Sequence, residues 1–349
     1  MEDMKQMGYL DEDNRLKRLS AMGDPLEKVT ASVEWSIFRP LLNEAYVKED
    51  RKSPAGRPPW DYLMLFKVLL LQEWYEIADD NTEYLINDRL SFQRFLGLGL
   101  GDKVPDAKTI WLFRERLKDK GMGKRLFDMF GAQLEKEGVV THKGSIVDAT
   151  FTDKPRQRNS REENEAVKAG KTPEEWKKSP HKLRQKDVDA RWTKKNEETH
   201  YGYKDHVKVD KDSKLITNFS VTDAAVHDSR EIAGLIDEKD KIVYADSAYV
   251  GEEHEGEIRK KNKSIILKIN EKGYRNRPLS DEQKAANKEK SRIRARVEHV
   301  FGFMSTTMEG IYIRCIGKAR ATLSITLKNL AYNLRRYAYL TGIRPASAG

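Results

Sequence analysis

Two aspartates stand in or directly after short apolar runs of the sequence. Asp148 lies inside the run 145–151, and Asp246 ends the run 241–246. A carboxylate in an apolar strand loses hydration unless it binds a cation or accepts strong hydrogen bonds. For either residue alone, an aspartate that caps a loop is the alternative. Two of them on strands of one sheet favour a shared divalent metal ion, because facing carboxylates repel each other.

A third acid, Glu298, lies among alternating arginines in the C-terminal half of the chain. The apolar residues around it recur at helical spacing and predict an inward-facing side; they are Val297, Val300, Phe301 and Met304. Glu298 borders this side, while a surface pair with Arg294 is the alternative. Together the three acids supply hard oxygen ligands for two Mg²⁺ ions. Such ions activate water or a 3′-hydroxyl and stabilise the leaving oxygen in phosphodiester attack.

The segment that carries these acids is predicted to be an α/β domain over residues 141–349. Short β-prone runs predict strands at 145–151, 201–209, 215–221, 241–246 and 264–269, the second and third joined as a hairpin. Helices are expected at 228–236, 281–303 and 319–340. This order predicts a mixed sheet flanked by helices.

Residues 1–140 are expected to form an all-helical N-terminal domain for DNA-end binding or dimerisation. Apolar residues at helical spacing follow the breaker 53–59, and further helices are expected at 82–89, 91–96, 106–118 and 126–137. The short helices could form a helix-turn-helix that docks on DNA, with Lys108, Thr109, Arg114 and Arg116 on its last helix. An ordinary helical bundle is the alternative.

A polar stretch separates the first two predicted strands. Residues 152–200 hold fourteen Lys or Arg and ten Asp or Glu with few aliphatic side chains. Such a composition cannot fill the core of a sheet, so the stretch is interpreted as a partly helical or mobile insert.

Positive charge is concentrated in the C-terminal part of the chain. The net charge is +9 overall, but residues 259–296 alone hold fourteen bases and four acids, and residues 314–336 hold six bases and no acid. Solvated helix faces are the alternative for any single run. Two adjacent runs in an otherwise acidic chain indicate a nucleic acid as partner. Arg292, Arg294 and Arg296 suit a helix that follows phosphates.

Composition excludes several other classes of protein. The most apolar stretch, 62–71, is interrupted by Lys67 and is far too short to span a membrane, and the first residues lack the apolar core of a signal peptide. One cysteine, Cys315, excludes an internal disulfide framework and a cysteine-based zinc site. A cytosolic, basic, globular protein is expected.

Several segments in a fixed order together resemble one known family. They are GRPPWDYLMLFKVLLLQ, INDRLSFQRFLGL, IVDAT, GYKDHVKVD, VTDAAVHDS, YADSAYVG, RARVEHVFG and NLAYNLRR, between about residue 56 and residue 336. The chain is similar to the DDE transposases of the bacterial and archaeal insertion-sequence-five (IS-five) group. The resemblance implies an RNase H-like catalytic domain and Mg²⁺-dependent DNA cleavage and strand transfer, with Mn²⁺ as a substitute ion.

Carried over residue by residue, the resemblance implies that Asp148, Asp246 and Glu298 are the catalytic and metal-binding acids. Arg294 also matches the family pattern, whereas Ser291 and Ser305 stand where the family often has Tyr and Lys.

The DNA contacts are expected from five residues: Lys204, Tyr249, Arg292, Arg294 and Arg296. For Tyr249, packing of its ring on the sheet is the alternative. His227 is interpreted as a turn and capping residue.

The resemblance also implies the partners and the location of the protein. These are double-stranded DNA at the terminal inverted repeats and at the target, a homodimer on that DNA, and a cytoplasmic, nucleoid-associated place in a prokaryote. Two other functions are kept open. One is a nuclease of the same fold that does not join strands, and the other is a degenerate transposase that only binds DNA.

Overall fold

The computed structural model describes residues 11–46, 59–155, 157–195, 197–249, 251–274 and 276–343. The chain divides into two compact units, one of residues 1–122 with 333–349 and the other of residues 123–332. We call them the helical unit and the sheet unit. The predicted boundary after residue 140 differs from this division, because most of helix α8 belongs to the sheet unit and the end of the last helix belongs to the helical unit. Residues 53–58 of the predicted breaker lie outside the described residues.

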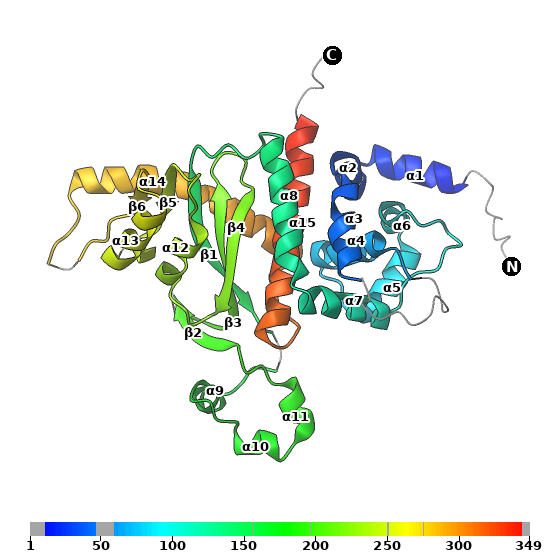
Figure 1. Ribbon diagram of the computed structural model, residues 1–349, viewed down its shortest axis with the longest axis horizontal. Helices are drawn as coiled ribbons and strands as arrows, with labels where there is room; N and C mark the ends of the chain where they lie inside the picture. The colour runs from blue at the N-terminus through cyan, green and yellow to red at the C-terminus, as the bar shows by residue number, and fades with distance from the viewer. Residues whose placement is uncertain are drawn as a thin grey trace. The chain divides into compact units, whose positions relative to one another are not determined.

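The helical unit is built from short helices, drawn in blue to cyan in Figure 1. They are α1 (Asp11–Ala21), α2 (Pro25–Ser32), η1 (Trp35–Phe38), α3 (Arg39–Glu44), α4 (Tyr62–Tyr75), α5 (Asp79–Asp88), α6 (Leu90–Leu96) and α7 (Ala107–Asp119). Helix α4 is apolar on nearly every side and most of its residues are buried, so it forms the centre of this unit. The Asp61 carboxylate caps its N-terminus by accepting from the Leu63 amide at 2.9 Å.

Two of the polar side chains of the predicted DNA-docking helix, α7, make internal contacts. The Arg114 guanidinium donates to the Asp79 carboxylate at 2.9 Å and to the Gln72 side chain at 2.6 Å. The Arg116 guanidinium lies 4.1 Å from the centre of the Tyr46 ring. Both arginines therefore hold helices of this unit together, as in a bundle.

The sheet unit contains one six-stranded mixed sheet (Figure 1). Its strands are β1 (Ser145–Asp153), β2 (Arg191–Lys195), β3 (Glu198–Asp210), β4 (Ile216–Asp223), β5 (Ile242–Ala245) and β6 (Ile266–Ile269). The order is β2-β3-β1-β5-β6, and β4 pairs with β3. Strand β3 is antiparallel to β1, β2 and β4, whereas β5 is parallel to β1 and to β6. The predicted mixed α/β sheet is thereby confirmed.

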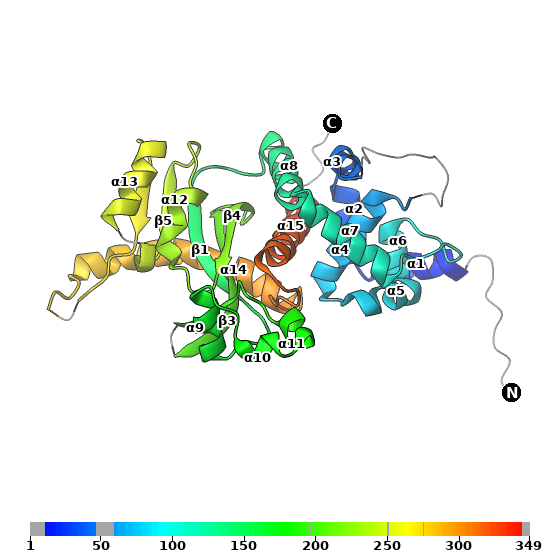
Figure 2. The ribbon, with the colours of Figure 1, turned by 60° about the horizontal axis from the view of Figure 1, so that its bottom comes forward.

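Helices cover both faces of this sheet (Figure 2). One face packs against α12 (Ile232–Leu235) and α13 (Glu252–Lys261) around an apolar cluster that includes Val147 and Ile258. The other face lies against α8 (Met122–Lys136), α14 (Asp281–Thr306) and the first part of α15 (Lys318–Ile343). The predicted helix 228–236 is divided into η2 (Asp228–Arg230) and α12. No described helix is long and apolar enough to cross a membrane.

The predicted insert is partly helical. It holds α9 (Arg161–Lys168), α10 (Glu174–Lys177) and α11 (Pro180–Gln185), followed by β2, which the sequence did not predict. The Ser160 side chain and Glu163 form a capping box at the start of α9. Gly202 of the GYKD segment has φ +152°, and a Cβ there would collide with the backbone carbonyl of Thr152 on β1. Glycine thus permits the close approach of β3 to the end of β1.

Candidate active site

Asp148 and Asp246 lie at neighbouring positions of the sheet. Asp148 is in the middle of β1, and Asp246 directly follows β5, the strand parallel to β1. The pairing of Ile146 with Tyr244 places both acids two residues further along and on the same face. The sheet therefore brings together two carboxylates that are 98 residues apart in the chain.

Each aspartate fixes one oxygen on a backbone amide. Asp148 Oδ1 accepts from the Ala149 amide at 2.9 Å, and Asp246 Oδ1 accepts from the Ala248 amide in the turn that becomes η3 (Ser247–Tyr249). Burial raises the pKa of the Asp148 carboxyl, although the bond from Ala149 opposes the shift. These anchors leave the Oδ2 atoms of both acids to face a common partner.

That partner is Arg294 on α14. One guanidinium nitrogen, Nη2, lies 3.7 Å from Asp148 Oδ2 and 3.7 Å from Asp246 Oδ2. The Nε atom of Arg294 is buried and has no hydrogen-bond partner among the described residues. The two acids therefore converge on a position that holds a positive charge. We call Asp148 and Asp246 the acid pair.

Glu298 lies one helical turn beyond Arg294 on α14 and is exposed. Residues four apart share a side of a helix, so Glu298 projects from the same side as Arg294. No three His, Cys, Asp or Glu side chains in the described parts of the chain are gathered so that they could hold a metal ion. The structure thus brings together two of the three predicted acids, Asp148 and Asp246, and places the Arg294 guanidinium near both. The inward side of α14 is buried at Val297, Val300 and Met304, as predicted, and Phe301 is half-buried.

Arg292 and Arg296 lie four residues apart and therefore share one side of α14, whereas Arg294, two residues from each, lies on another side. Arg292 is exposed, and Arg294 faces the acid pair. Arg296 donates to the Lys211 carbonyl at 2.7 Å and lies 3.2 Å from Asp212 Oδ1. Arg292 is the most exposed residue of the three, and the Arg296 side chain is 43% exposed.

Two of the predicted DNA contacts are buried in the structure. The Lys204 ammonium donates to Asp228 Oδ1 at 2.9 Å and to the Val226 carbonyl at 2.7 Å. Tyr249 packs into the apolar cluster under α12 and α13, where burial raises the pKa of its hydroxyl well above the usual value. Both side chains are thus engaged inside the sheet unit, and a DNA contact of either one stays a prediction. His227 caps η2 by accepting from the Ser229 amide, in agreement with its predicted turn role.

The two serines at the family's Tyr and Lys positions have partners close by. Ser291 Oγ accepts from the Asn270 side chain at 3.0 Å, after β6. Ser305 Oγ donates to the Gly302 carbonyl at 3.1 Å, within α14. Ser291 thus ties α14 to the loop beyond the sheet.

The sequence did not reveal the contact of Arg294 with both aspartates. The sequence predicted a DNA phosphate as the partner of Arg294, with a surface pair to Glu298 as the alternative, whereas the structure turns the guanidinium toward the sheet. One signal could have revealed this contact: two carboxylates predicted to face each other need a positive partner, and an arginine of the protein can provide it.

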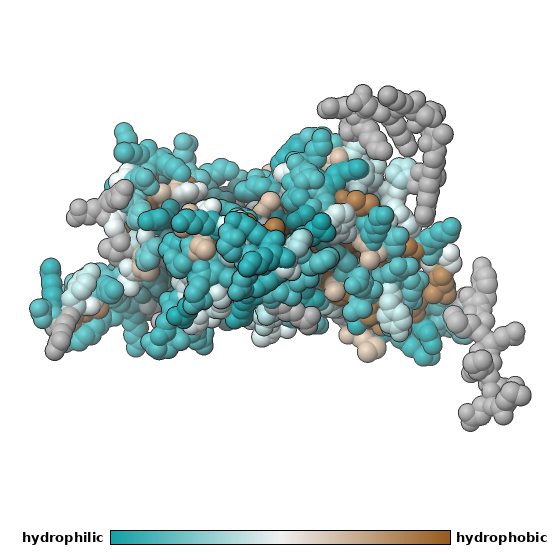
Figure 3. All heavy atoms as spheres, turned by 90° about the horizontal axis from the view of Figure 1, so that it is seen from below, coloured by the Kyte–Doolittle hydropathy of each residue, from teal (hydrophilic) through white to brown (hydrophobic). Residues whose placement is uncertain are grey.

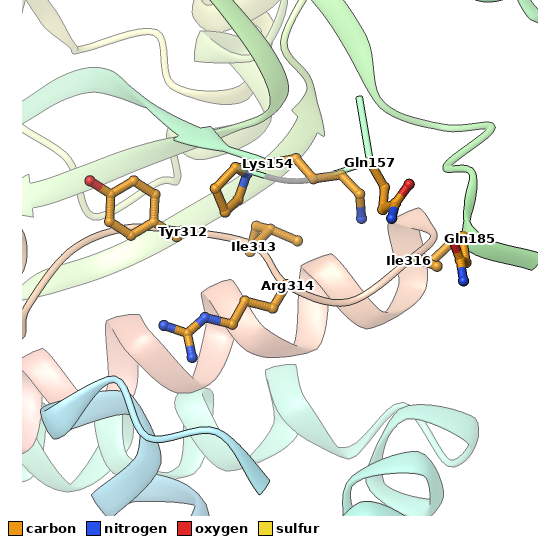
Figure 4. Close-up of a pocket in the computed structure, with 8 residues that line it drawn as sticks. Lys154, Gln157, Gln185, Tyr312, Ile313, Arg314 and Ile316 are labelled. Atoms are coloured by element: carbon orange, nitrogen blue, oxygen red, sulfur yellow. The ribbon is translucent and has the colours of Figure 1, made fainter. Parts of the chain in front are cut away.

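A cavity of 580 Å³ lies at the far end of β1, between the segment after Asp153 and the segment before α15 (Figure 4). It is lined by Lys154, Pro155, Gln157, Gln185, Tyr312, Ile313, Arg314 and Ile316. Tyr312 and Gln185 stand toward opposite ends of this lining in Figure 4. Asp153 lies five positions beyond Asp148 along the strand, or about 17 Å at 3.3 Å per residue. The lining contains no carboxylate, so the cavity is not the predicted metal site.

Basic side chains are exposed along the predicted positive run, which we call the basic segment (residues 259–296). Its exposed members are Arg259, Lys260, Lys261, Lys263, Lys268, Lys272, Arg277, Lys284, Lys288 and Arg292. Hydrophilic side chains also predominate over the sheet unit on the face drawn in Figure 3. This charge is on the same unit as the acid pair and continues into α14.

Two family models match the chain. The model described as Transposase DDE domain matches residues 141–334, and one described as Transposase domain matches residues 13–116. The first covers more than half of the chain, so the chain belongs to the Transposase DDE domain family and is a DNA transposase. A solved structure, the cryo-EM structure of piggyBac transposase synaptic complex with hairpin DNA, is 12% identical with a TM-score of 0.43. The match covers 95% of this chain and 79% of that chain.

Proposed function

We propose that this member of the Transposase DDE domain family belongs to the IS-five group and cuts and joins DNA at the ends of an insertion sequence. The observation that carries the proposal is the convergence of Asp148 and Asp246 on one cationic position. Two such carboxylates are suited to metal-assisted attack on phosphodiester bonds, which is the chemistry expected of a transposase family.

The donor set of the site fits divalent metal. Both Oδ2 atoms are hard oxygen ligands, and the amide anchors on Oδ1 hold each carboxylate in place. Asp148, Asp246 and Glu298 would hold two Mg²⁺ ions, for which Mn²⁺ substitutes. In such sites the ions supply activation of a water or 3′-hydroxyl and stabilisation of the leaving oxygen.

The remaining residues bind and orient DNA in this proposal. Arg292 and the other exposed bases of the basic segment neutralise phosphates of the bound DNA. The partner is double-stranded DNA, both at the terminal inverted repeats and at the target. Joining two ends of one element requires two active sites, so we propose a homodimer on DNA. In this proposal the protein acts in the cytoplasm of a prokaryote, on the DNA of the nucleoid.

The test uses the DNA that flanks the coding region, where short inverted repeats are expected. The purified full-length protein is incubated with a plasmid carrying both flanks, a target plasmid and Mg²⁺, and nicked and joined products are mapped. Asp148→Asn and Asp246→Asn should each lower cleavage at least about 100-fold, since loss of an outer-shell partner alone costs 10- to 100-fold. Both variants should still shift the end DNA in a gel.

Asp281→Asn is the matched control, because Asp281 is an exposed acid on the same helix as Arg294 and its loss should leave cleavage unchanged. Cleavage without joined products would replace the transposase reaction by that of a nuclease. Full cleavage by Asp148→Asn would remove this residue from the mechanism.

A further inference from the structure

We propose that Arg294 is an internal counter-ion that competes with divalent metal for the acid pair and that DNA phosphate relieves this competition. The inference rests on the proposed function, because it takes Asp148 and Asp246 to be metal ligands. It adds that the protein without DNA holds its metal site closed with its own guanidinium.

The geometry around Arg294 is that of a charge contact without a hydrogen bond. Its Nη2 lies 3.7 Å from both carboxylates, beyond the 2.7–2.9 Å usual for a charged N–H···O bond. A half-buried arginine pair elsewhere in the chain is shorter, with Arg94 at 2.6 Å from Asp24. Arg294 is therefore attracted to the acid pair by charge, without a hydrogen bond to either carboxylate.

The contact is also incomplete at the other end of the guanidinium. Nε of Arg294 is buried without a hydrogen-bond partner among the described residues, which costs free energy. The side chain is 21% exposed, so solvent screens it only in part. An arrangement that satisfies neither Nη2 nor Nε fully is one that another ligand can displace at low cost.

A divalent ion and the guanidinium cannot both neutralise the same two oxygens. Like charges a few ångströms apart repel, and partial burial strengthens the repulsion. The metal must therefore bind with Arg294 moved away, and the free energy of that movement lowers metal affinity. Arg296, tied to the Lys211 carbonyl, has no such role.

A backbone phosphate offers Arg294 what the acid pair does not. Phosphate oxygens accept two parallel hydrogen bonds from one guanidinium, and the basic segment, whose last part lies on the same helix, attracts the DNA backbone. Once Arg294 binds phosphate, the acid pair carries an uncompensated negative charge. Metal and DNA then each raise the affinity for the other.

The experiment measures Mn²⁺ affinity of the full-length protein by electron paramagnetic resonance, with and without a short non-specific DNA duplex. Without DNA, Arg294→Gln should bind Mn²⁺ at least about 5-fold more tightly than the wild type, the lower end of typical coupling. The duplex should tighten Mn²⁺ binding by a similar factor in the wild type and by less than two-fold in Arg294→Gln. Lys171→Gln removes one exposed charge from the sheet unit outside the basic segment and should leave Mn²⁺ affinity without DNA unchanged.

Weaker or unchanged Mn²⁺ binding by a folded Arg294→Gln would overturn the inference, because Arg294 would then organise the acids. The wild type supplies a second measurement that needs no variant: an affinity for Mn²⁺ that the duplex leaves unchanged also overturns it. Asp148→Asn and Asp246→Asn separate this failure from that of the proposed function. If those two variants keep full Mn²⁺ affinity, the acid pair is not the metal site and both proposals fall.

Discussion

Two clusters of opposite charges lie on opposite faces of one sheet and differ in how completely they are bonded. Lys204 is paired with Phe151, which lies three residues beyond Asp148 on β1. Side chains alternate between the two faces of a sheet, so Asp148 and Lys204 point to opposite faces. Lys204 meets Asp228 at 2.9 Å with both side chains at most 10% exposed. Arg294 meets the acid pair at 3.7 Å, with Asp246 33% exposed.

The difference teaches how a structural ion pair can be told from a site that exchanges ligands. The Lys204 ammonium also donates to the Val226 carbonyl, so it is satisfied without solvent or ligand. The carboxyl pKa values move in opposite directions. Burial raises the pKa of Asp148, whereas at Asp228 burial is outweighed by Lys204, Lys195 and His206 together, so the pKa of Asp228 is lowered. One cluster stabilises the fold, whereas the raised pKa of Asp148 means that the other costs stability at neutral pH.

The largest expected effect is on the buried pair. Asp228→Asn leaves the Lys204 ammonium buried without a negative partner, so the free energy of unfolding should fall by about 3–5 kcal/mol. The folded pKa of Asp228 is lowered, so this contribution is present above about pH 4 and is lost as the pH falls further. Urea unfolding at pH 7, followed by circular dichroism, measures the loss.

The exposed Asp281→Asn serves as its control. A double variant, Lys204→Met with Asp228→Leu, should lose less stability than Asp228→Asn alone, since it leaves no buried charge unpaired. An Asp228→Asn protein as stable as the wild type would end the distinction between the two clusters.

The next effect concerns Asp205, a third carboxylate, on the face of Asp148. It is buried and accepts one bond, from the Asn329 side chain at 3.2 Å, and burial raises its pKa to about 7. The unfolded chain loses this proton near pH 4, so Asp205 lowers stability progressively as the pH rises from about 4 to about 7. Asp205→Asn should therefore melt at a higher temperature than the wild type at pH 8 and at a similar temperature at pH 4. Parallel pH profiles of the two melting temperatures would refute this.

A smaller effect of opposite sign to that of Asp228→Asn is expected at the acid pair. The raised pKa of Asp148 means that its ionised form costs stability at neutral pH, and Asp148→Asn removes that cost. The melting temperature at pH 7 should rise modestly while cleavage is lost. A destabilisation as large as that of Asp228→Asn would show that the Arg294 contact is a structural bridge after all.

The smallest effect is on DNA affinity. Arg292→Gln removes one exposed charge from α14, and each phosphate that is no longer neutralised should lower the slope of log affinity against log salt by about one. Fluorescence anisotropy with a labelled duplex at several salt concentrations measures the slope. Arg296→Gln should change it less, because Arg296 is held by Lys211 and Asp212.

Hydrophobic periodicity predicted the long elements of the fold because their burial is regular. Strand β1 begins at the predicted residue 145, and α14 begins at the predicted residue 281. Strand β2 was missed since its sequence, RWTKK, lacks alternation and none of its residues is fully buried. The helix predicted from residue 228 is divided at Glu231, which ends η2 and precedes α12.

The site was predictable to the extent that it depends on strands. Asp148 and Asp246 could be placed together because parallel neighbours carry their side chains in register. The orientation of Arg294 depends on how α14 rotates against the sheet, and no local spacing encodes that rotation. The burial of Lys204 could not be predicted either, because its partner Asp228 is 24 residues away in the sequence.

Helix α15 has a consequence for how the chain matures on the ribosome. Its residues up to Tyr332 complete the sheet unit, and those from Asn333 complete the helical unit, where the Arg335 guanidinium donates to the Tyr75 hydroxyl at 3.2 Å. The first 122 residues therefore leave the exit tunnel well before their last partner is synthesised. A nascent chain that stalls before residue 333 has an unfinished N-terminal half, so premature termination yields no intact helical unit.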